Sequence, residues 1–255
     1  MKKIALVTGA TSGIGKATAI MLADCGFNLI ITGRRNERLN ELKSQLEIKY
    51  KSEALPLCFD IRNRNEVCNA IENIPAKWKN ISVLVNNAGL AVGLNHIQDG
   101  LFDDWERMID TNIRGLLYIT RCVAPMMIEN KQGHIINIGS VAGKDVYENG
   151  NVYCATKYAV DALSKAMRID MLKHNIKVTN VCPGAVETEF SIVRFKDDTE
   201  RAKATYDRMT PLNGDDIANV IRFVISLPPH VCVNDIVVTP TSQANALIIH
   251  RNENQ

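Results

Sequence analysis

The chain has 255 residues, of which 46% are hydrophobic and 23% are charged, and its formal net charge is +2. This length and composition are typical of one globular α/β domain, and the nearly balanced charge gives no reason to expect nucleic-acid binding. No apolar stretch approaches the length of a membrane span, so we expect no association with a membrane.

The cysteines and histidines indicate no metal or disulfide chemistry. Seven cysteines are spread along the chain without a CxxC pair, and five histidines show no metal-ligand spacing. An odd, loosely spaced set of cysteines favours neither a disulfide framework nor a zinc site. The apolar run at 4–7 is too short for a secretory signal. We therefore expect a cytoplasmic protein that binds no metal.

Short β-branched runs alternate with longer amphipathic stretches along the whole chain. We predict strands at 4–8, 28–32, 55–59, 82–86, 134–138, 178–181 and 235–239, and helices near 13–25, 36–48, 64–74, 102–130, 153–174 and 215–226. Nearly continuous hydrophobicity is typical of parallel strands that are covered on both faces. The alternation predicts one α/β domain over 1–255, with a Rossmann-type, doubly wound parallel sheet of about seven strands and helices on both faces.

A glycine-rich segment, TGATSGIG (8–15), follows the first strand and leads into the first helix. Such a sheet binds ligands beyond the carboxyl ends of its strands. Glycines allow the backbone to turn tightly and to approach a pyrophosphate at the helix N-terminus. The spacing, G-x3-G-x-G, differs from the general dinucleotide fingerprint, but its position favours the same use. The predicted phosphate site comprises Gly9, Thr11, Ser12, Gly13, Ile14 and Gly15.

The second strand ends in ITGRRNER, which places Arg34 and Arg35 where NAD-binding sites carry an acidic residue. The planar donor fork of arginine suits the 2′-phosphate of NADP. Both arginines could instead be solvated at the start of a helix, although the helix dipole disfavours cations there. The pair therefore predicts NADP as the cofactor.

Tyr153 and Lys157 lie four residues apart in NVYCATK, so a helix places them on one face. A free phenol has a pKa of about 10, and a nearby cation lowers that pKa. Such a pair also occurs by chance on many solvated helices. Its interpretation therefore depends on the other segments that follow the strands.

These segments are Asp60, NNAG (86–89), NIGS (137–140) and PGAVETEF (183–190). Together with TGATSGIG, with Asn112 in IDTNIRG and with the Tyr153–Lys157 pair, they resemble the short-chain dehydrogenase/reductase family. The resemblance spans essentially the whole chain. It implies an oxidoreductase that acts on CH–OH groups by hydride transfer to or from a nicotinamide, without a metal.

The resemblance also implies roles for single residues. Tyr153 would be the general acid and base, and Lys157 would lower the pKa of Tyr153 and hold the nicotinamide ribose. Ser140 would bind the substrate oxygen, and Asn112 would kink its helix and position Lys157 through a water. The implied cofactor contacts are Asp60 and Ile61 at the adenine, Asn87, Ala88 and Gly89 at the adenine ribose, Tyr153 and Lys157, and Pro183, Gly184, Val186 and Thr188 at the nicotinamide end. Two alternatives stay open: Asn87 could only satisfy backbone groups, and Gly184 could only make a turn.

Several segments are similar to a narrower group, the NADP-dependent 3-hydroxy acid dehydrogenases, which oxidise serine, allo-threonine and 3-hydroxypropionate-type acids. They include GRRNERLNEL, GHIINIGSVAG and, in the expected substrate lid near 186–212, TEFSIVRFK. The likeness implies a substrate carboxylate held by Arg194, whose fork can bind both oxygens. Arg194 could alternatively be a solvated lid residue beside Lys196.

Other readings of the same chain remain possible. Lys144, Asp145 and Glu148 could alter the rim that faces the substrate. The chain could be another short-chain carbonyl reductase, acting on β-ketoacyl thioesters or sugars, or a non-catalytic NADP-sensing regulator. The retained Ser140, Tyr153 and Lys157 argue against the regulator. Family members are commonly homotetramers, which here would pair the helices at 102–130 and 153–174. The C-terminal tail, 240–255, could join that interface or pack on its own subunit.

Overall fold

The computed structural model describes residues 2–252. Its sheet has seven strands in the described part of the chain, with the order β3-β2-β1-β4-β5-β6-β7, and every neighbouring pair is parallel. The strands are β1 (Ile4–Val7), β2 (Asn28–Gly33), β3 (Ala54–Cys58), β4 (Ile81–Asn86), β5 (Gly133–Ile138), β6 (Ile176–Pro183) and β7 (Asp235–Val238). The predicted doubly wound sheet is confirmed.

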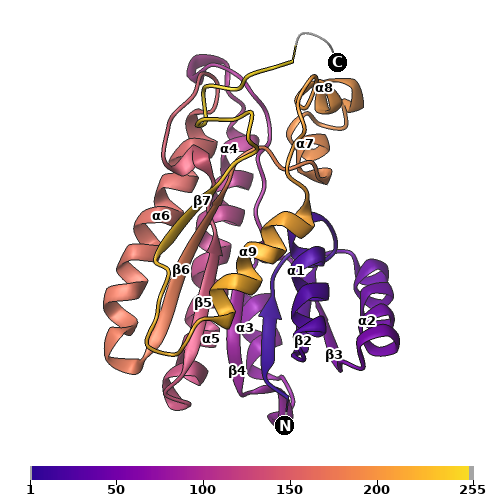
Figure 1. Cartoon of the computed structure of the whole chain (residues 1–255), viewed down its shortest axis with the longest axis vertical. Coiled ribbons are helices and arrows are strands. Elements are labelled where there is room, and N and C mark those ends of the chain that lie inside the picture. The colour runs from indigo at the N-terminus through magenta and orange to yellow at the C-terminus, as the bar shows by residue number, and fades with distance from the viewer. Residues whose placement is uncertain (1, 253–255) are drawn as a thin grey trace.

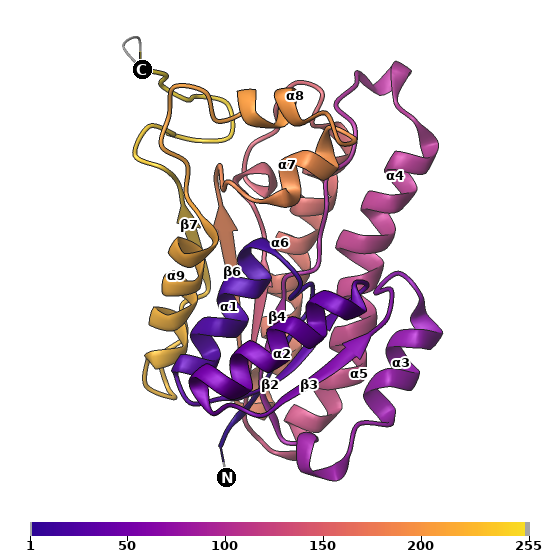
Figure 2. The ribbon, with the colours of Figure 1, turned by 90° about the vertical axis from the view of Figure 1, so that its right-hand side faces the viewer.

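Helices cover both faces of the sheet, as Figures 1 and 2 show. The side chains of β1 alternate between two cores: Val7 packs with α1, α2 and α9, whereas Leu6 packs with α3, α5 and α6. This alternation follows from the period of two along a strand. The helices named here are α1 (Gly13–Asp24), α2 (Asn36–Tyr50), α3 (Arg64–Glu72), α5 (Leu116–Glu129), α6 (Asn151–Met171) and α9 (Gly214–Ser226).

The helix predicted at 102–130 is continuous but not uniform. It consists of α4 (Phe102–Ile109), a π-helical turn (Asp110–Gly115) and α5, which contains Pro125. A π turn widens the helix by one residue and is common at functional sites. Asn112 lies within this turn, so the widening occurs where the sequence predicts a kink.

The segment 186–212 leaves the sheet after β6 and contains two short helices, α7 (Glu189–Arg194) and α8 (Thr199–Ala204). Val186 and Leu212 form an isolated parallel bridge that closes the base of this segment, which we call the lid. The lid lies above the carboxyl ends of the strands (Figure 1). The sequence pattern did not predict α7 and α8, because each has only six residues.

The chain after β7 returns over the same end of the molecule, where Gln243 and Ile249 form an isolated antiparallel bridge. Residue 1 of the predicted domain and residues 253–255 of the predicted tail lie outside the described residues. In the described part of the chain, no helix combines the length and apolarity that a bilayer crossing requires.

Candidate active site

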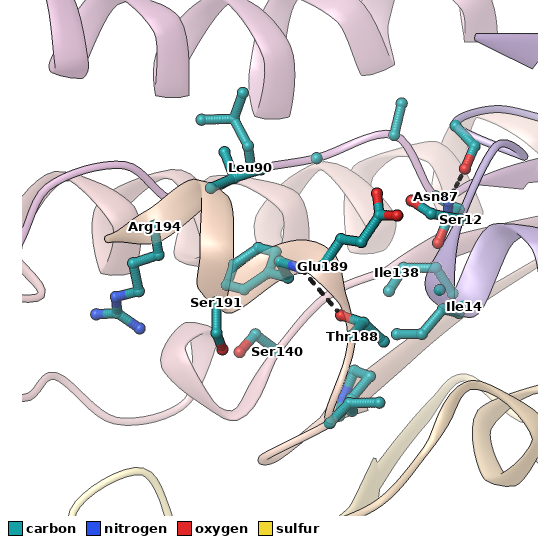
Figure 3. A pocket seen from close by; sticks show the side chains of 18 of the residues that line it. Ser12, Ile14, Asn87, Leu90, Ile138, Ser140, Thr188, Glu189, Ser191 and Arg194 are labelled. Carbon is teal, nitrogen blue, oxygen red and sulfur yellow. Dashed lines mark hydrogen bonds between the residues drawn. The ribbon is translucent and has the colours of Figure 1, made fainter. Parts of the chain in front are cut away.

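A cavity of about 490 Å³ opens at the carboxyl ends of the strands, beneath α7. Figure 3 shows it running from Ser12 and Asn87 at one end to Arg194 at the other, with Ser140 between them. The predicted site residues that line it are Gly9, Thr11, Ser12, Gly13, Ile14, Arg34, Arg35, Asp60, Ile61, Asn87, Ala88, Gly89, Ser140, Tyr153, Lys157, Pro183, Gly184, Val186, Thr188 and Arg194. Gly15 and Asn112 were also predicted site residues, but they do not line the cavity.

The glycine-rich loop is held closely against the loop that follows β4. A Cβ at Gly15 would lie 2.3 Å from the Gly9 carbonyl oxygen and 2.3 Å from Asn87 Nδ2, so no larger residue fits there. Ser12 begins α1 without making a capping hydrogen bond of its own. The first residues of α1, Gly13 and Ile14, line the cavity, so the helix N-terminus lies where it can bind a phosphate.

The Asn87 side chain serves this loop directly. Its Nδ2 donates to the carbonyl oxygens of Thr8 and Gly9, at 2.8 and 3.1 Å, and its backbone amide donates to Thr8 Oγ1. The alternative considered for Asn87, that it satisfies backbone groups, therefore describes its side chain in this structure.

Arg34 and Arg35 both reach the cavity but differ in their contacts. Arg35 donates to the hydroxyls of Thr11 and Ser12 and to Glu189 of the lid. The guanidinium of Arg34 makes no hydrogen bond or ion pair within residues 2–252. Arg38 of α2 donates to the other oxygen of Glu189. The three cations and the one carboxylate leave an excess of two positive charges at this end of the cavity.

The Tyr153 side chain is buried, with 9% of its surface exposed, and packs against Phe190 of the lid. Burial raises the pKa of its phenol, and Tyr147 raises it further, while Ser140 and Arg194 act in the opposite direction. The net direction differs from the lowering that we expected, because desolvation outweighs the nearby charge.

Lys157 lies one helical turn after Tyr153 in α6 and is also buried. Its ammonium donates to the carbonyl oxygen of Ile138 at 2.9 Å and lies 5.9 Å from the centre of the Tyr153 ring. Burial lowers the pKa of Lys157 to about 8. Asn112 does not reach Lys157 by a direct hydrogen bond. It bonds to both backbone groups of Leu90 and donates to Thr156 Oγ1, so it links α6 to the loop after β4.

Ser140 follows β5 and faces the same space. Its hydroxyl accepts a hydrogen bond from the amide of Ala142 at 3.0 Å, which fixes the Oγ position at the start of a short 3-10 turn. The structure thus brings a phenol, an ammonium and a hydroxyl together from α6 and the end of β5.

Comparison with known proteins agrees with this geometry. The family described as short chain dehydrogenase matches residues 3–199. The chain belongs to the short-chain dehydrogenase family. It is 46% identical, over 97% of its length and 99% of the relative's, to an NADP-dependent 3-hydroxy acid dehydrogenase of Salmonella typhi. It is 39% identical, over 98% and 97% of the two chains, to the Schizosaccharomyces pombe protein of that name.

Two solved structures resemble it closely. A closed form of serine dehydrogenase complexed with NADP+ superposes with a TM-score of 0.90 at 44% identity, covering 98% of this chain and 100% of that one. A serine dehydrogenase from Escherichia coli has a TM-score of 0.80 at 39% identity, covering 94% and 99%. Family membership makes this chain an oxidoreductase acting on CH–OH groups.

In this short-chain dehydrogenase, Arg194 is the last residue of α7 and lines the end of the cavity that is farthest from Ser12 (Figure 3). Its Nη2 donates to Tyr147 Oη at 2.8 Å, and its guanidinium lies 5.3 Å from the Tyr147 ring and 5.7 Å from the Tyr153 ring. Its Nε is buried and has no hydrogen-bond acceptor among the described residues. The arginine is therefore oriented but incompletely satisfied.

The rim of the cavity in this short-chain dehydrogenase does not include Lys144, Asp145 or Glu148. Lys144 pairs with Asp161 of α6 and Asp235 of β7, at 2.6 and 2.5 Å. Glu148 is exposed and lies 3.7 Å from His96. The side chain of Asp145, like the other two, is not part of the described cavity lining.

Sequence reasoning missed several residues that line the cavity of the short-chain dehydrogenase: Tyr147, Glu189, Phe190, Tyr206 and Gln243. Glu189 and Phe190 are the last two residues of the recognised PGAVETEF segment, so their position was a usable signal. Tyr147 lies six residues before Tyr153 without a periodic pattern, and Gln243 arrives from the C-terminal tail. No local signal in the sequence points to either.

Proposed function

We propose that the chain is an NADP-dependent dehydrogenase that transfers a hydride between nicotinamide and carbon 3 of a small 3-hydroxy acid, such as serine, allo-threonine or 3-hydroxypropionate. The observation that carries this substrate class is Arg194, whose buried Nε lacks an acceptor beside Tyr153. A guanidinium fork can hold both oxygens of a carboxylate. The relatives that carry the 3-hydroxy acid dehydrogenase name support the proposal.

The donor set fits NADP at the other end of the cavity. A 2′-phosphate carries a charge of about −1.5 to −2, which balances the excess of positive charge among Arg34, Arg35, Arg38 and Glu189. Arg34 is free to make the direct contact, and the open amides of α1 suit the pyrophosphate. The other cofactor contacts that we propose are the predicted residues between Asp60 and Thr188 in the sequence that line the cavity. When bound, NADP supplies the hydride acceptor, and NADPH the donor.

Tyr153 would exchange the proton of the substrate oxygen. Because burial raises the pKa of this phenol, Tyr153 is protonated at neutral pH and is ready to donate a proton during carbonyl reduction. Ser140 would bind the same oxygen from the side of β5, and its fixed Oγ would stabilise developing charge. Lys157 would hold the nicotinamide ribose, and Asn112 would keep α6 in place through Thr156.

The proposal is tested by following NADP reduction with a panel of acids and neutral analogues. We expect turnover with serine, allo-threonine or 3-hydroxypropionate and much weaker turnover with 3-hydroxypropionamide, which lacks the carboxylate. Activity on β-ketoacyl thioesters or sugars, with none on any small 3-hydroxy acid, would overturn the substrate class.

The Arg194→Met variant sharpens this test. Loss of a charged hydrogen bond of about 1.5–3 kcal/mol should raise KM for 3-hydroxypropionate by one to two orders of magnitude, with little change for the amide. Arg194→Lys, which keeps the charge without the fork, is the matched control. Its KM for 3-hydroxypropionate should lie between those of the wild type and Arg194→Met. An equal effect on acid and amide would show that Arg194 only orders the lid.

We also infer a cytoplasmic homotetramer, supported by exposed apolar residues on the helices expected to pair. Leu117 of α5 and Ile169 of α6 are 39% and 76% exposed, and Ile248 of the tail is 62% exposed. All seven cysteines are free, which fits a reducing compartment. Analytical ultracentrifugation should give four times the chain mass, and Ile169→Lys should lower that mass.

A further inference from the structure

Asp104 is a buried carboxylate that the catalytic proposal does not use. It lies in the first turn of α4 and is 7% exposed. A buried carboxylate is costly unless it is paired. Its partner is Lys196, whose Nζ lies 2.8 Å from Asp104 Oδ2. Lys196 belongs to the lid and follows Arg194 by two residues, so the ion pair joins α4 to the end of α7.

A second contact holds the lid at the same point. The amide of Gly93, in the loop after β4, donates to the carbonyl oxygen of Arg194 at 3.0 Å. Gly93 has φ of +74°, and a Cβ there would lie 2.8 Å from Asp104 Oδ2. The glycine therefore allows the loop to pass between the buried carboxylate and the lid. The backbone of Arg194 and the side chain of Lys196 are fixed by neighbouring groups from two different elements.

This arrangement determines which lid cation faces the cavity. The Lys196 ammonium is bound to Asp104, outside the cavity lining, whereas the Arg194 guanidinium lies over Tyr147 and Tyr153. Freed from Asp104, a flexible lysine could compete for an incoming carboxylate, and the end of α7 would lose its side-chain anchor. The ion pair thus helps to position Arg194 and also keeps Lys196 from acting as a second anion-binding group.

We propose that Asp104 and Lys196 are positioning residues that hold the end of α7 so that Arg194 faces the substrate carboxylate. The proposal rests on the proposed function for the identity of that substrate. The ion pair itself is a property of the lid and can be tested without any substrate. The two parts can therefore fail separately.

The kinetic test uses Asp104→Asn and Lys196→Met in the full chain, with Lys203→Met on α8 as a matched lid control. We expect Asp104→Asn and Lys196→Met each to raise KM for 3-hydroxypropionate about tenfold, which is the low end for a charged hydrogen bond because the Lys196 side chain is half-exposed. KM for the amide and the Kd of NADPH should stay within about twofold of the wild type. Lys196→Arg should retain the wild-type KM. The double variant should cost little more than either single variant, because both remove one interaction.

Hydrogen–deuterium exchange over 189–204 supplies the second readout. Exchange should be faster in Asp104→Asn than in the wild type or Lys203→Met, whichever substrate the enzyme prefers. Unchanged lid exchange, equal KM effects on acid and amide, or fully additive single variants would overturn the positioning role. If the wild type ignored all 3-hydroxy acids while Asp104→Asn loosened the lid, the substrate proposal would fail and the ion-pair anchor would stand.

Discussion

Arg35 Nη1 donates to Glu189 Oε2 across 2.7 Å, which joins the N-terminal end of α2 to the first residue of α7. The same arginine bonds the hydroxyls of Thr11 and Ser12 at the start of α1. The guanidinium expected to hold a 2′-phosphate therefore also touches the lid. A cofactor phosphate that binds Arg35 would therefore compete with Glu189 of the lid for this guanidinium.

The first prediction concerns the choice of cofactor. Replacing Arg34 and Arg35 together by Gln should weaken NADPH binding at least tenfold and NADH binding much less, because charged hydrogen bonds are worth about 1.5–3 kcal/mol each. Titration of protein fluorescence with each nucleotide measures the two Kd values. Lys43→Gln is the control, since Lys43 is also on α2 but pairs with Glu47 and does not line the cavity. Equal losses for NADPH and NADH would show that the arginines act through the fold.

Removal of the Tyr153 hydroxyl tests the chemistry. Tyr153→Phe keeps the ring that packs on Phe190 but cannot transfer a proton, so kcat should fall by at least ~10²-fold. The Kd of NADPH should persist, because the glycine-rich loop is unchanged. Tyr147→Phe, which removes a neighbouring hydroxyl, should retain far more turnover. Near-normal turnover by the Tyr153 variant would refute the mechanism.

Lys157 makes the stability of the cofactor-free protein depend on pH. Its folded pKa of about 8 is below the unfolded value of about 10.4. Below pH 8 the protein bears the full cost of a buried charge, and that cost disappears as the pH rises from 8 to 10.4, because only the unfolded chain keeps the proton. The unfolding free energy of Lys157→Met, taken relative to the wild type, should therefore be higher at pH 7 than at pH 10 by on the order of 2 kcal/mol. Urea unfolding at both pH values measures this, and the exposed Lys165→Met should show no such change.

His134 should control stability at acid pH. Its Nε2 lies 2.8 Å from Thr179 Oγ1, which itself donates to Val233, so the imidazole is the donor. Burial lowers the pKa of His134 to about 3. The folded state keeps the ring neutral while the unfolded state binds a proton, so stability falls as the pH drops from about 6.5 to 3.

Substitution of His134 isolates that effect. His134→Gln should remove about 3 kcal/mol of the difference in unfolding free energy between pH 7 and pH 4. The exposed His230→Gln should leave the difference unchanged. A wild-type pH slope retained in His134→Gln would mean that other groups dominate acid unfolding.

The sheet and the ends of its strands could be read from the sequence because their signals are local. Seven apolar runs gave seven parallel strands, and nearly every residue chosen after them lines the cavity. The direction of Asn87 could not be read, since its side chain turns toward a carbonyl 78 residues away. The partner of Lys144 could not be read for the same reason: Asp235 lies on β7, whose proximity depends on the fold. The net shift of the Tyr153 pKa depends on burial, which no local spacing reports.

The π-helical turn at Asp110–Gly115 makes the length of this segment critical. The wide turn holds one residue more than a regular α-helical turn, so deleting one residue there would restore a regular helix and leave the flanking helices in phase. Ile119 and Val123, which are fully buried in α5, would still face the sheet. Asn112, which lies within the turn, would instead be displaced from Leu90 and Thr156, and the link between α6 and the loop after β4 would be lost. We therefore expect close relatives to carry neither insertions nor deletions across this turn, even where their residues differ.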